Sequence, residues 1–176
     1  SITPHTGRKL DFAIIGVLTV AVVLLLTDRF VLRHGVNQMT AASIPEKSIA
    51  VLPLLNSTGD SANEYFSDGM SEEFISSLSS LHELKVIGRS SSFQFKGKTE
   101  DSKTVGEKLG VSYLLEGSVR KSADRVRIAV ALVKAGDGAN LWSETYDREL
   151  KDIFAVQSEI AGAVAKQLKV ALLGNN

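Results

Sequence analysis

The stretch VSYLLEGSVRKSADRVRIAVALVKAGDGANLWSETY, residues 111–146, decides the fold of this chain. Apolar side chains alternate with polar or small ones along it, most clearly in RVRIAVALV at residues 125–133. A period of two places one set of side chains on each face of a strand, so the alternation predicts strands with one buried face. With GDG at residues 136–138 as a hairpin turn, we predict an antiparallel meander of strands at residues 111–120, 125–133 and 140–146.

Periodicity on both sides of the meander predicts the remaining elements. Apolar residues three and four positions apart indicate helices, and short β-branched runs indicate buried strands. These elements are strands at residues 48–55 and 84–87, and helices at residues 68–81, 101–109 and from 152 onward. Asp68 stands at the expected N-cap of the first helix, and Gly110 at the end of the second. The order β-α-β-α-β-β-β-α predicts an α/β (α+β) domain, a mixed sheet with helices packed against it.

Composition restricts the classes of function. The 176 residues include 20 Lys and Arg and 20 Asp and Glu, with 3 His and no Cys. A formal net charge of zero disfavours non-specific nucleic-acid binding, which needs a basic excess. The absence of Cys excludes disulfides, thiol nucleophiles and Cys-based zinc sites. Composition therefore favours a non-enzymatic module that binds no nucleic acid.

An apolar run near the N-terminus predicts a membrane anchor. Residues 12–27, FAIIGVLTVAVVLLLT, carry no charge. The frame from residue 10 to residue 32 is long enough for the roughly 20 residues that a bilayer core requires. We therefore predict a tail at residues 1–9, a transmembrane helix at 10–32, a linker at 33–47 and a folded domain at 48–173.

Two alternatives to the anchor stay open. A buried helix of a soluble domain would leave no polar face for solvent. A cleaved signal peptide would have its small-residue site, TAA at residues 40–42, far past the apolar run. The basic residues do not set the orientation, because Arg8 and Lys9 precede the run and Arg29 and Arg33 follow it.

No motif in the predicted domain indicates catalysis. GKT at residues 97–99 resembles the end of a phosphate-binding loop, but Ser92 stands where that motif needs glycine. An ordinary basic loop is the favoured interpretation. Trp142 and Tyr146 share one face of a predicted strand, where they either line a groove, or cover the sheet edge or pack under a helix. We predict no catalytic residue, no metal ligand and no cofactor.

Six ordered motifs carry a resemblance to a known family. They are SIAVLP at residues 48–53, EYFSDGMSEE at 64–73, FKGK at 95–98, YLLEGSVRK at 113–121, LWSETYDREL at 141–150 and DIFAVQSEIA at 152–161. Together they resemble the TolB N-terminal-like (FlgO-like) domain of bacterial membrane-anchored signalling proteins. The resemblance covers about residues 48–172, and in such proteins tetratricopeptide repeats usually follow the domain.

The resemblance implies a location and a role. It implies a single-pass protein of the bacterial inner membrane, with the folded domain in the periplasm and without catalysis in this region. We expect a non-enzymatic interaction or sensory module of a longer signalling protein, with a protein or envelope component as partner. The alternative is a segment of a membrane-bound transcriptional regulator, nucleotide cyclase or kinase whose DNA-binding or catalytic domain lies elsewhere in the protein. The candidate binding residues are Glu64, Tyr65, Phe66, Asp68, Trp142 and Tyr146.

Overall fold

The computed structural model describes residues 14–23 and 43–174. It divides into two units, Ser1–Ser43 and Ile44–Asn176. Residues 14–23 are helical, and they are the described part of the predicted transmembrane helix at residues 10–32. Within the two described ranges, no helix combines the length and the apolar character needed to cross a membrane. The rest of that prediction, the tail at residues 1–9 and most of the linker lie outside the described residues.

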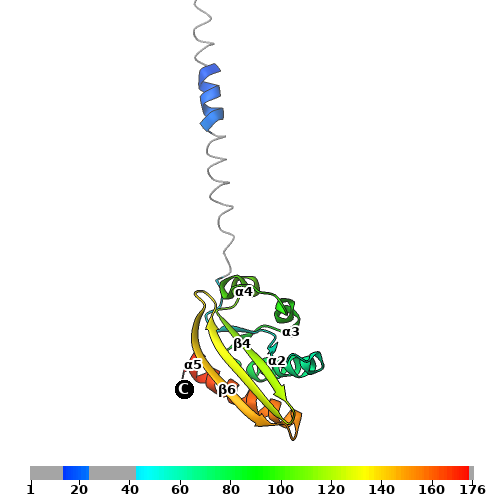
Figure 1. Ribbon diagram of the computed structural model, residues 1–176. Coiled ribbons are helices and arrows are strands. Elements are labelled where there is room, and N and C mark those ends of the chain that lie inside the picture. Colours follow the sequence, from blue (N-terminus) through cyan, green and yellow to red (C-terminus); the bar gives the residue numbers. More distant parts are fainter. Residues whose placement is uncertain (1–13, 24–42, 175–176) are drawn as a thin grey trace, which may run out of the picture. The chain divides into compact units, whose positions relative to one another are not determined.

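The second unit is built on a mixed six-stranded sheet (Figure 1). Its strands are β1 (Ser48–Val51), β2 (Leu55–Asn56), β3 (Lys85–Val86), β4 (Tyr113–Ser122), β5 (Arg125–Lys134) and β6 (Ala139–Glu149). The strand order is β3-β1-β4-β5-β6, and β2 pairs with β4 beyond the end of β1. The pairs β1–β3, β1–β4 and β2–β4 are parallel. The pairs β4–β5 and β5–β6 are antiparallel, so the predicted meander is confirmed.

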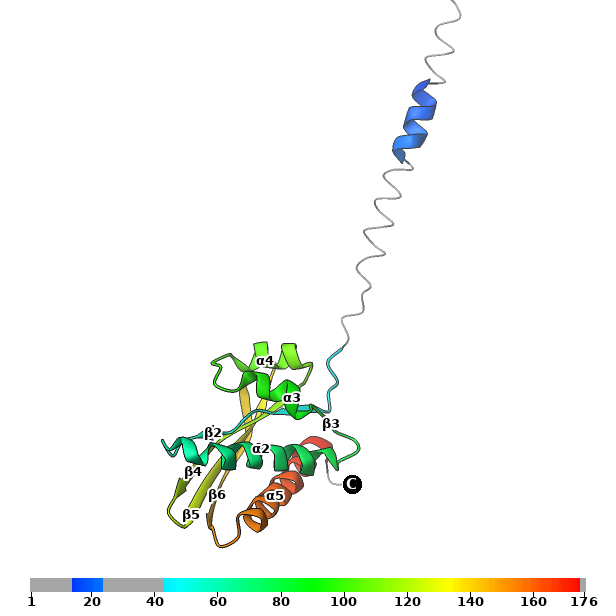
Figure 2. The same cartoon turned by 90° about the vertical axis from the view of Figure 1, so that its right-hand side faces the viewer.

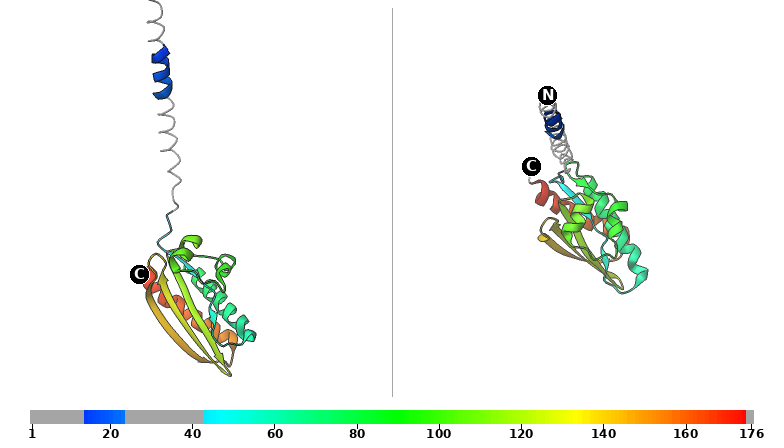
Figure 3. Two further views of the ribbon diagram at one scale, coloured as in Figure 1. Left: turned by 45° about the horizontal axis from the view of Figure 1, so that its top comes forward. Right: turned by 90° about the horizontal axis from the view of Figure 1, so that it is seen from above.

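Helices lie on both faces of the sheet (Figure 2). They are α2 (Glu64–Ser79), α3 (Arg89–Ser92), α4 (Ser102–Leu109) and α5 (Ile153–Leu173), with short 3-10 turns at Ser61–Asn63 and Phe93–Phe95. The helices α2 and α5 pack side by side on one face (Figure 3). The helices α3 and α4 lie on the opposite face, near the start of β4.

The main core forms between the sheet and the α2–α5 pair. The strand β5 buries every second side chain, Val126, Ile128, Val130 and Leu132, and the alternation predicted this face. Four apolar residues of α2 recur at intervals of four and are fully buried: Phe66, Met70, Phe74 and Leu78. Removing a buried side chain of this size costs several kcal/mol, because both transfer free energy and packing are lost.

The start of the first long helix differs from its prediction. The helix α2 begins at Glu64 with Asn63 at its N-cap, so the assignment of Asp68 as the N-cap is wrong. Asp68 lies inside the helix, because the buried interval of four starts already at Phe66. Structure also adds β2, α3 and the turn at Phe93–Phe95 to the predicted order.

The first helix also ends at Ser79, two residues before the predicted end, whereas the predicted boundaries of the other two helices agree with the structure. The Asp101 carboxylate accepts a hydrogen bond from the Thr104 amide at 3.0 Å and caps α4. Gly110 ends that helix at a φ of 64°, a left-handed conformation that favours glycine. Asp152 caps α5 by accepting hydrogen bonds from the amides of Phe154 and Ala155, at 3.0 and 3.1 Å.

We expect Asp152→Ala to lower the free energy of unfolding by about 1 kcal/mol, because two amide groups at the start of α5 lose their acceptor. Urea denaturation measures the change. The matched control is Asp124→Ala, at an exposed turn position that caps no helix. An equal loss in both variants would contradict the capping role.

Candidate functional site

A groove of about 760 Å³ lies on the face of the sheet that carries α3 and α4. Two rows of paired residues from β4, β5 and β6 form its floor. These rows are Glu116–Ala131–Ser143 and Ser118–Ala129–Thr145. Apart from Glu116, every member is small, so the floor presents hydroxyl and methyl groups.

The groove exists because α4 covers only part of this sheet face. Val105 of α4 packs on Leu114 and Val133, which form the next row along β4 and β5. On the far side of the floor, Arg127 pairs with Asp147 at 2.8 Å. The groove therefore lies between an apolar row covered by α4 and a charged row exposed to solvent.

Glu116 is the charged residue of the groove floor. Its side chain is half-buried. Burial raises the pKa of the Glu116 carboxyl, and a hydrogen bond with the Ser102 side chain opposes the shift. Among the ion pairs formed by residues 43–174, none includes Glu116. The arrangement is a carboxylate that has lost part of its hydration and has not gained a cation.

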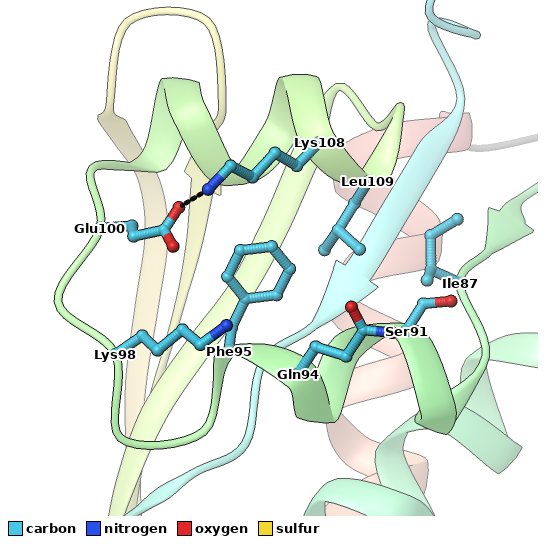
Figure 4. Close-up of a pocket in the computed structure, with 8 residues that line it drawn as sticks. All are labelled: Ile87, Ser91, Gln94, Phe95, Lys98, Glu100, Lys108 and Leu109. Atoms are coloured by element: carbon cyan, nitrogen blue, oxygen red, sulfur yellow. Dashed lines mark hydrogen bonds and ion pairs between the residues drawn. The ribbon is translucent and has the colours of Figure 1, made fainter.

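A second cavity, of about 390 Å³, lies between α3 and α4 (Figure 4). The Phe95 ring stands in it with Lys98 Nζ at 5.6 Å and Lys108 Nζ at 5.9 Å from the ring centroid. Glu100 holds Lys108 through a contact of 2.6 Å. Phe95, Lys98 and Glu100 line both cavities, so the segment 95–100 separates the groove from this pocket.

Lys96 links the segment 95–100 to helix α2 through two ion pairs. Lys96 Nζ lies 2.8 Å from a carboxylate oxygen of Glu64 and 2.6 Å from one of Asp68. The hydrogen bond from Lys96 is the main cause that lowers the pKa of Glu64. Desolvation acts to lower the pKa of Lys96, but the bonds to Asp68 and Glu64 outweigh it, and the pKa rises. Glu64 and Asp68, two of the predicted binding residues, therefore hold the segment 95–100 in place through Lys96, but they do not themselves line the groove.

The six predicted binding residues do not form one surface. Glu64, Tyr65 and Asp68 lie on the first turns of α2, where Tyr65 is 60% exposed. Phe66 is fully buried in the main core. The groove occupies the opposite face of the sheet from this core. Sequence reasoning missed Glu116, because a polar residue in an alternating strand is expected to face solvent.

Trp142 and Tyr146 follow the second of the two interpretations left open by the sequence. Tyr146 is 6% exposed within the main core, and Trp142 packs against it. The Tyr146 hydroxyl donates a hydrogen bond to the Glu144 carboxylate at 3.2 Å. Burial, the largest cause, and the Glu144 charge raise the pKa of Tyr146 from 10.0 to about 12.

This shift predicts a pH dependence at the alkaline end. A pKa raised by folding means that the folded state holds the proton more tightly. The stabilisation is therefore complete below pH 10.0 and is lost as pH rises toward 12. We expect Tyr146→Phe to unfold less steeply than the wild type over this range, as measured by circular dichroism at stepwise pH. Identical alkaline profiles would contradict the shift.

Metal binding has no support in the described part of the chain. Within residues 14–23 and 43–174, no group of three or more His, Cys, Asp or Glu side chains is arranged to hold a metal ion. The polar groups that line the groove, three carboxylates, the Lys98 ammonium group and several hydroxyls, can bind a ligand or a partner by hydrogen bonds and charge.

The fold and the groove define a class of domain, a mixed sheet with helices on both faces and part of one face left open. Residues 45–163 match the family described as HilA/YgeH-like transcriptional regulator, second domain, and the chain belongs to this family. The matched residues include β1 to β6, and therefore the whole floor of the groove.

A relative from Rhizobium meliloti (strain 1021) carries the name "Putative adenylate cyclase 3". It is 49% identical over 130 residues, which cover 73% of this chain and 22% of the relative. The present chain therefore spans about a fifth of the length of that relative.

Solved structures share the fold at low identity. Lipoprotein GNA1162 from Neisseria meningitidis has a TM-score of 0.52 and 21% identity, covering 72% of this chain and 99% of that one. A PelC dodecamer from Paraburkholderia phytofirmans has a TM-score of 0.51 and 15% identity, covering 72% and 90%. TolB from Acinetobacter baumannii has a TM-score of 0.48 and 14% identity, covering 72% and 30%. The domain thus shares its fold with lipoprotein GNA1162 and with PelC.

Proposed function

We propose that the domain is a non-enzymatic interaction or sensory module of a longer bacterial signalling protein. The observation that carries the proposal is the groove, where a floor of three hydrogen-bonded strands presents small side chains and one half-buried carboxylate. Binding surfaces need a fixed backbone and room for partner side chains, and this floor supplies both.

The comparisons support an input role over a catalytic one. The family carries the name of a transcriptional regulator, and the Rhizobium relative carries the name of an adenylate cyclase. Gene regulation and cyclic-nucleotide synthesis are different outputs. A domain shared by proteins with both names fits best as the part that receives a signal or a partner.

We further propose that the domain lies in the periplasm and that residues 10–32 anchor it in the inner membrane. The uncharged run within those residues and the fold shared with a lipoprotein support this location. A protein or an envelope component is the proposed partner. FlgO-like relatives and following tetratricopeptide repeats belong to the same proposal.

Photo-crosslinking in living cells tests the interaction role. A photoreactive amino acid replaces Ala131 or Thr145 on the groove floor, and Lys166 on the exposed side of α5 as the control. We expect one defined protein or glycan adduct from both groove positions and none from Lys166. Adducts from Lys166 alone, or the same pattern from all three positions, would contradict the groove as the binding surface.

The second candidate is a direct part in nucleotide cyclisation, favoured by the 49% identical relative. The test is isothermal titration of the purified chain with ATP or GTP and magnesium, together with an assay for cyclic nucleotide. We expect no heat of binding and no product. Binding with turnover would replace the interaction proposal by the catalytic one.

A further inference from the structure

We propose that the groove accepts a lysine or arginine side chain of a partner protein, with the cationic end on Glu116. The inference rests on the proposed interaction role and names the chemistry of the partner. Its basis is a carboxylate without an ion-pair partner on an open sheet face, in a groove whose other carboxylates, Glu100 and Glu144, contact Lys108 and the Tyr146 hydroxyl.

The charge of the Glu116 carboxylate is the first feature that favours a cationic partner. Glu116 is half-buried and belongs to no ion pair among residues 43–174. Apart from the hydrogen bond with Ser102, the Glu116 carboxylate has nothing to replace its lost hydration, and a cation at contact distance would stabilise its charged form.

Two cations near the groove are already paired with carboxylates of this chain. Lys108 is paired with Glu100 at 2.6 Å, and Arg127 with Asp147 at 2.8 Å. Lys98 also lines the groove, but its ammonium group lies over the Phe95 ring, 5.6 Å from the centroid. The cation that Glu116 lacks is therefore one that a partner can supply.

The shape of the groove floor is the second feature, because it favours a long aliphatic side chain. Directly across the strands from Glu116 are Ala131 and then Ser143, and the parallel row contains Ala129. Methyl and hydroxyl groups leave space for an aliphatic stem to lie flat over β5 while its charged end reaches Glu116. Lysine and arginine combine such a stem with a charged end.

The size and openness of the groove favour a protein as the source of the cation. The groove, at about 760 Å³, is far larger than one amine, and its floor continues to exposed Ser143 and Thr145 on the edge strand β6. A peptide chain can therefore enter over the edge strand and place one basic side chain inward. An enclosed pocket would instead suit a free small amine.

The test is an NMR titration of the full chain, held in detergent micelles, with short alanine–serine peptides. The central residue of the peptide is lysine, arginine, norleucine or glutamate. We expect the lysine and arginine peptides to shift the amide signals of Glu116, Ala131 and Ser143. The norleucine peptide keeps the stem without the charge and is expected to bind about tenfold more weakly, between the values for exposed and buried pairs.

Two variants keep the test specific. Glu116→Gln is expected to remove the preference for basic peptides, and Glu107→Gln, the same change at an exposed position of α4 outside the groove, is expected to retain it. Ala131→Lys places a cation of the chain itself beside Glu116, so it is expected to block the basic peptides.

Three results would overturn the proposal: equal binding of the lysine and norleucine peptides, an unchanged preference in Glu116→Gln, or wild-type affinity in Ala131→Lys. Agmatine binding as tightly as the peptides would assign the site to a small amine and overturn the protein source. An adduct from the groove in cells, together with any of these results, would preserve the interaction role while removing the basic side chain from it.

Discussion

Replacing Phe66 with alanine is expected to lower the free energy of unfolding by about 3–5 kcal/mol, because the ring is fully buried between α2 and the sheet. A loss of this size consumes much of the stability of an ordinary domain. Urea denaturation followed by tryptophan fluorescence measures it, since Trp142 packs against the same core.

The neighbouring residue supplies the control. Tyr65 is 60% exposed, so Tyr65→Ala is expected to change the free energy of unfolding by less than about 0.5 kcal/mol. Comparing Phe66→Ala with Tyr65→Ala distinguishes a structural role from a binding role within EYFSDG, residues 64–69. Equal stability of the two variants would show that Phe66 does not belong to the core.

Gly117→Ala is the second change with a large expected effect. A Cβ atom at Gly117 would lie 2.2 Å from the Ala129 carbonyl oxygen and 2.9 Å from Leu54 Cδ2. The first of these atoms is backbone of the paired strand and cannot turn away. We expect a loss of roughly 3 kcal/mol, at the upper end for overpacked positions, measured by thermal and urea unfolding.

Gly136→Ala is the matched control for this change, because no atom lies within 4 Å of the added Cβ there. It is expected to leave stability nearly unaltered. A Gly117→Ala chain as stable as the wild type would show that β4 and β5 do not approach as closely as the structure has them. It would also question the floor of the groove, which these strands form.

The sequence predicted those parts of the fold that depend on local patterns. Alternation in β4 and β5 identified the buried face, and Asp101, Gly110 and Asp152 marked helix ends by their capping chemistry. Each of these signals acts within a few residues of the chain. The prediction of a mixed sheet followed from the element order alone.

Other features needed the tertiary structure. The strand β2 has two residues and is defined only by its pairing with β4. The start of α2 was placed at Asp68, an acidic residue of a type common at helix N-caps, whereas burial of Phe66 extends the helix one turn earlier. Tertiary packing, and not a local sequence pattern, determines both the strand β2 and the start of α2.

The candidate site belongs to this second group. The alternation shows that Glu116 and Ala131 face away from the main core, but not that α4 leaves this part of the sheet face open. A groove on a sheet face exists where no helix covers the strands. Its position therefore depends on the length and placement of a helix elsewhere in the chain. No local pattern around Glu116 carries this information.

The measurement that tests the central claim most directly is a topology fusion in living bacteria. Alkaline phosphatase, which is active only outside the cytoplasm, is joined after Pro45, at the start of the folded unit. A cytoplasmic reporter at the same junction is the control. We predict phosphatase activity and a silent cytoplasmic reporter, as required of a periplasmic interaction module. The reverse pattern would contradict that location and place the groove among cytoplasmic partners.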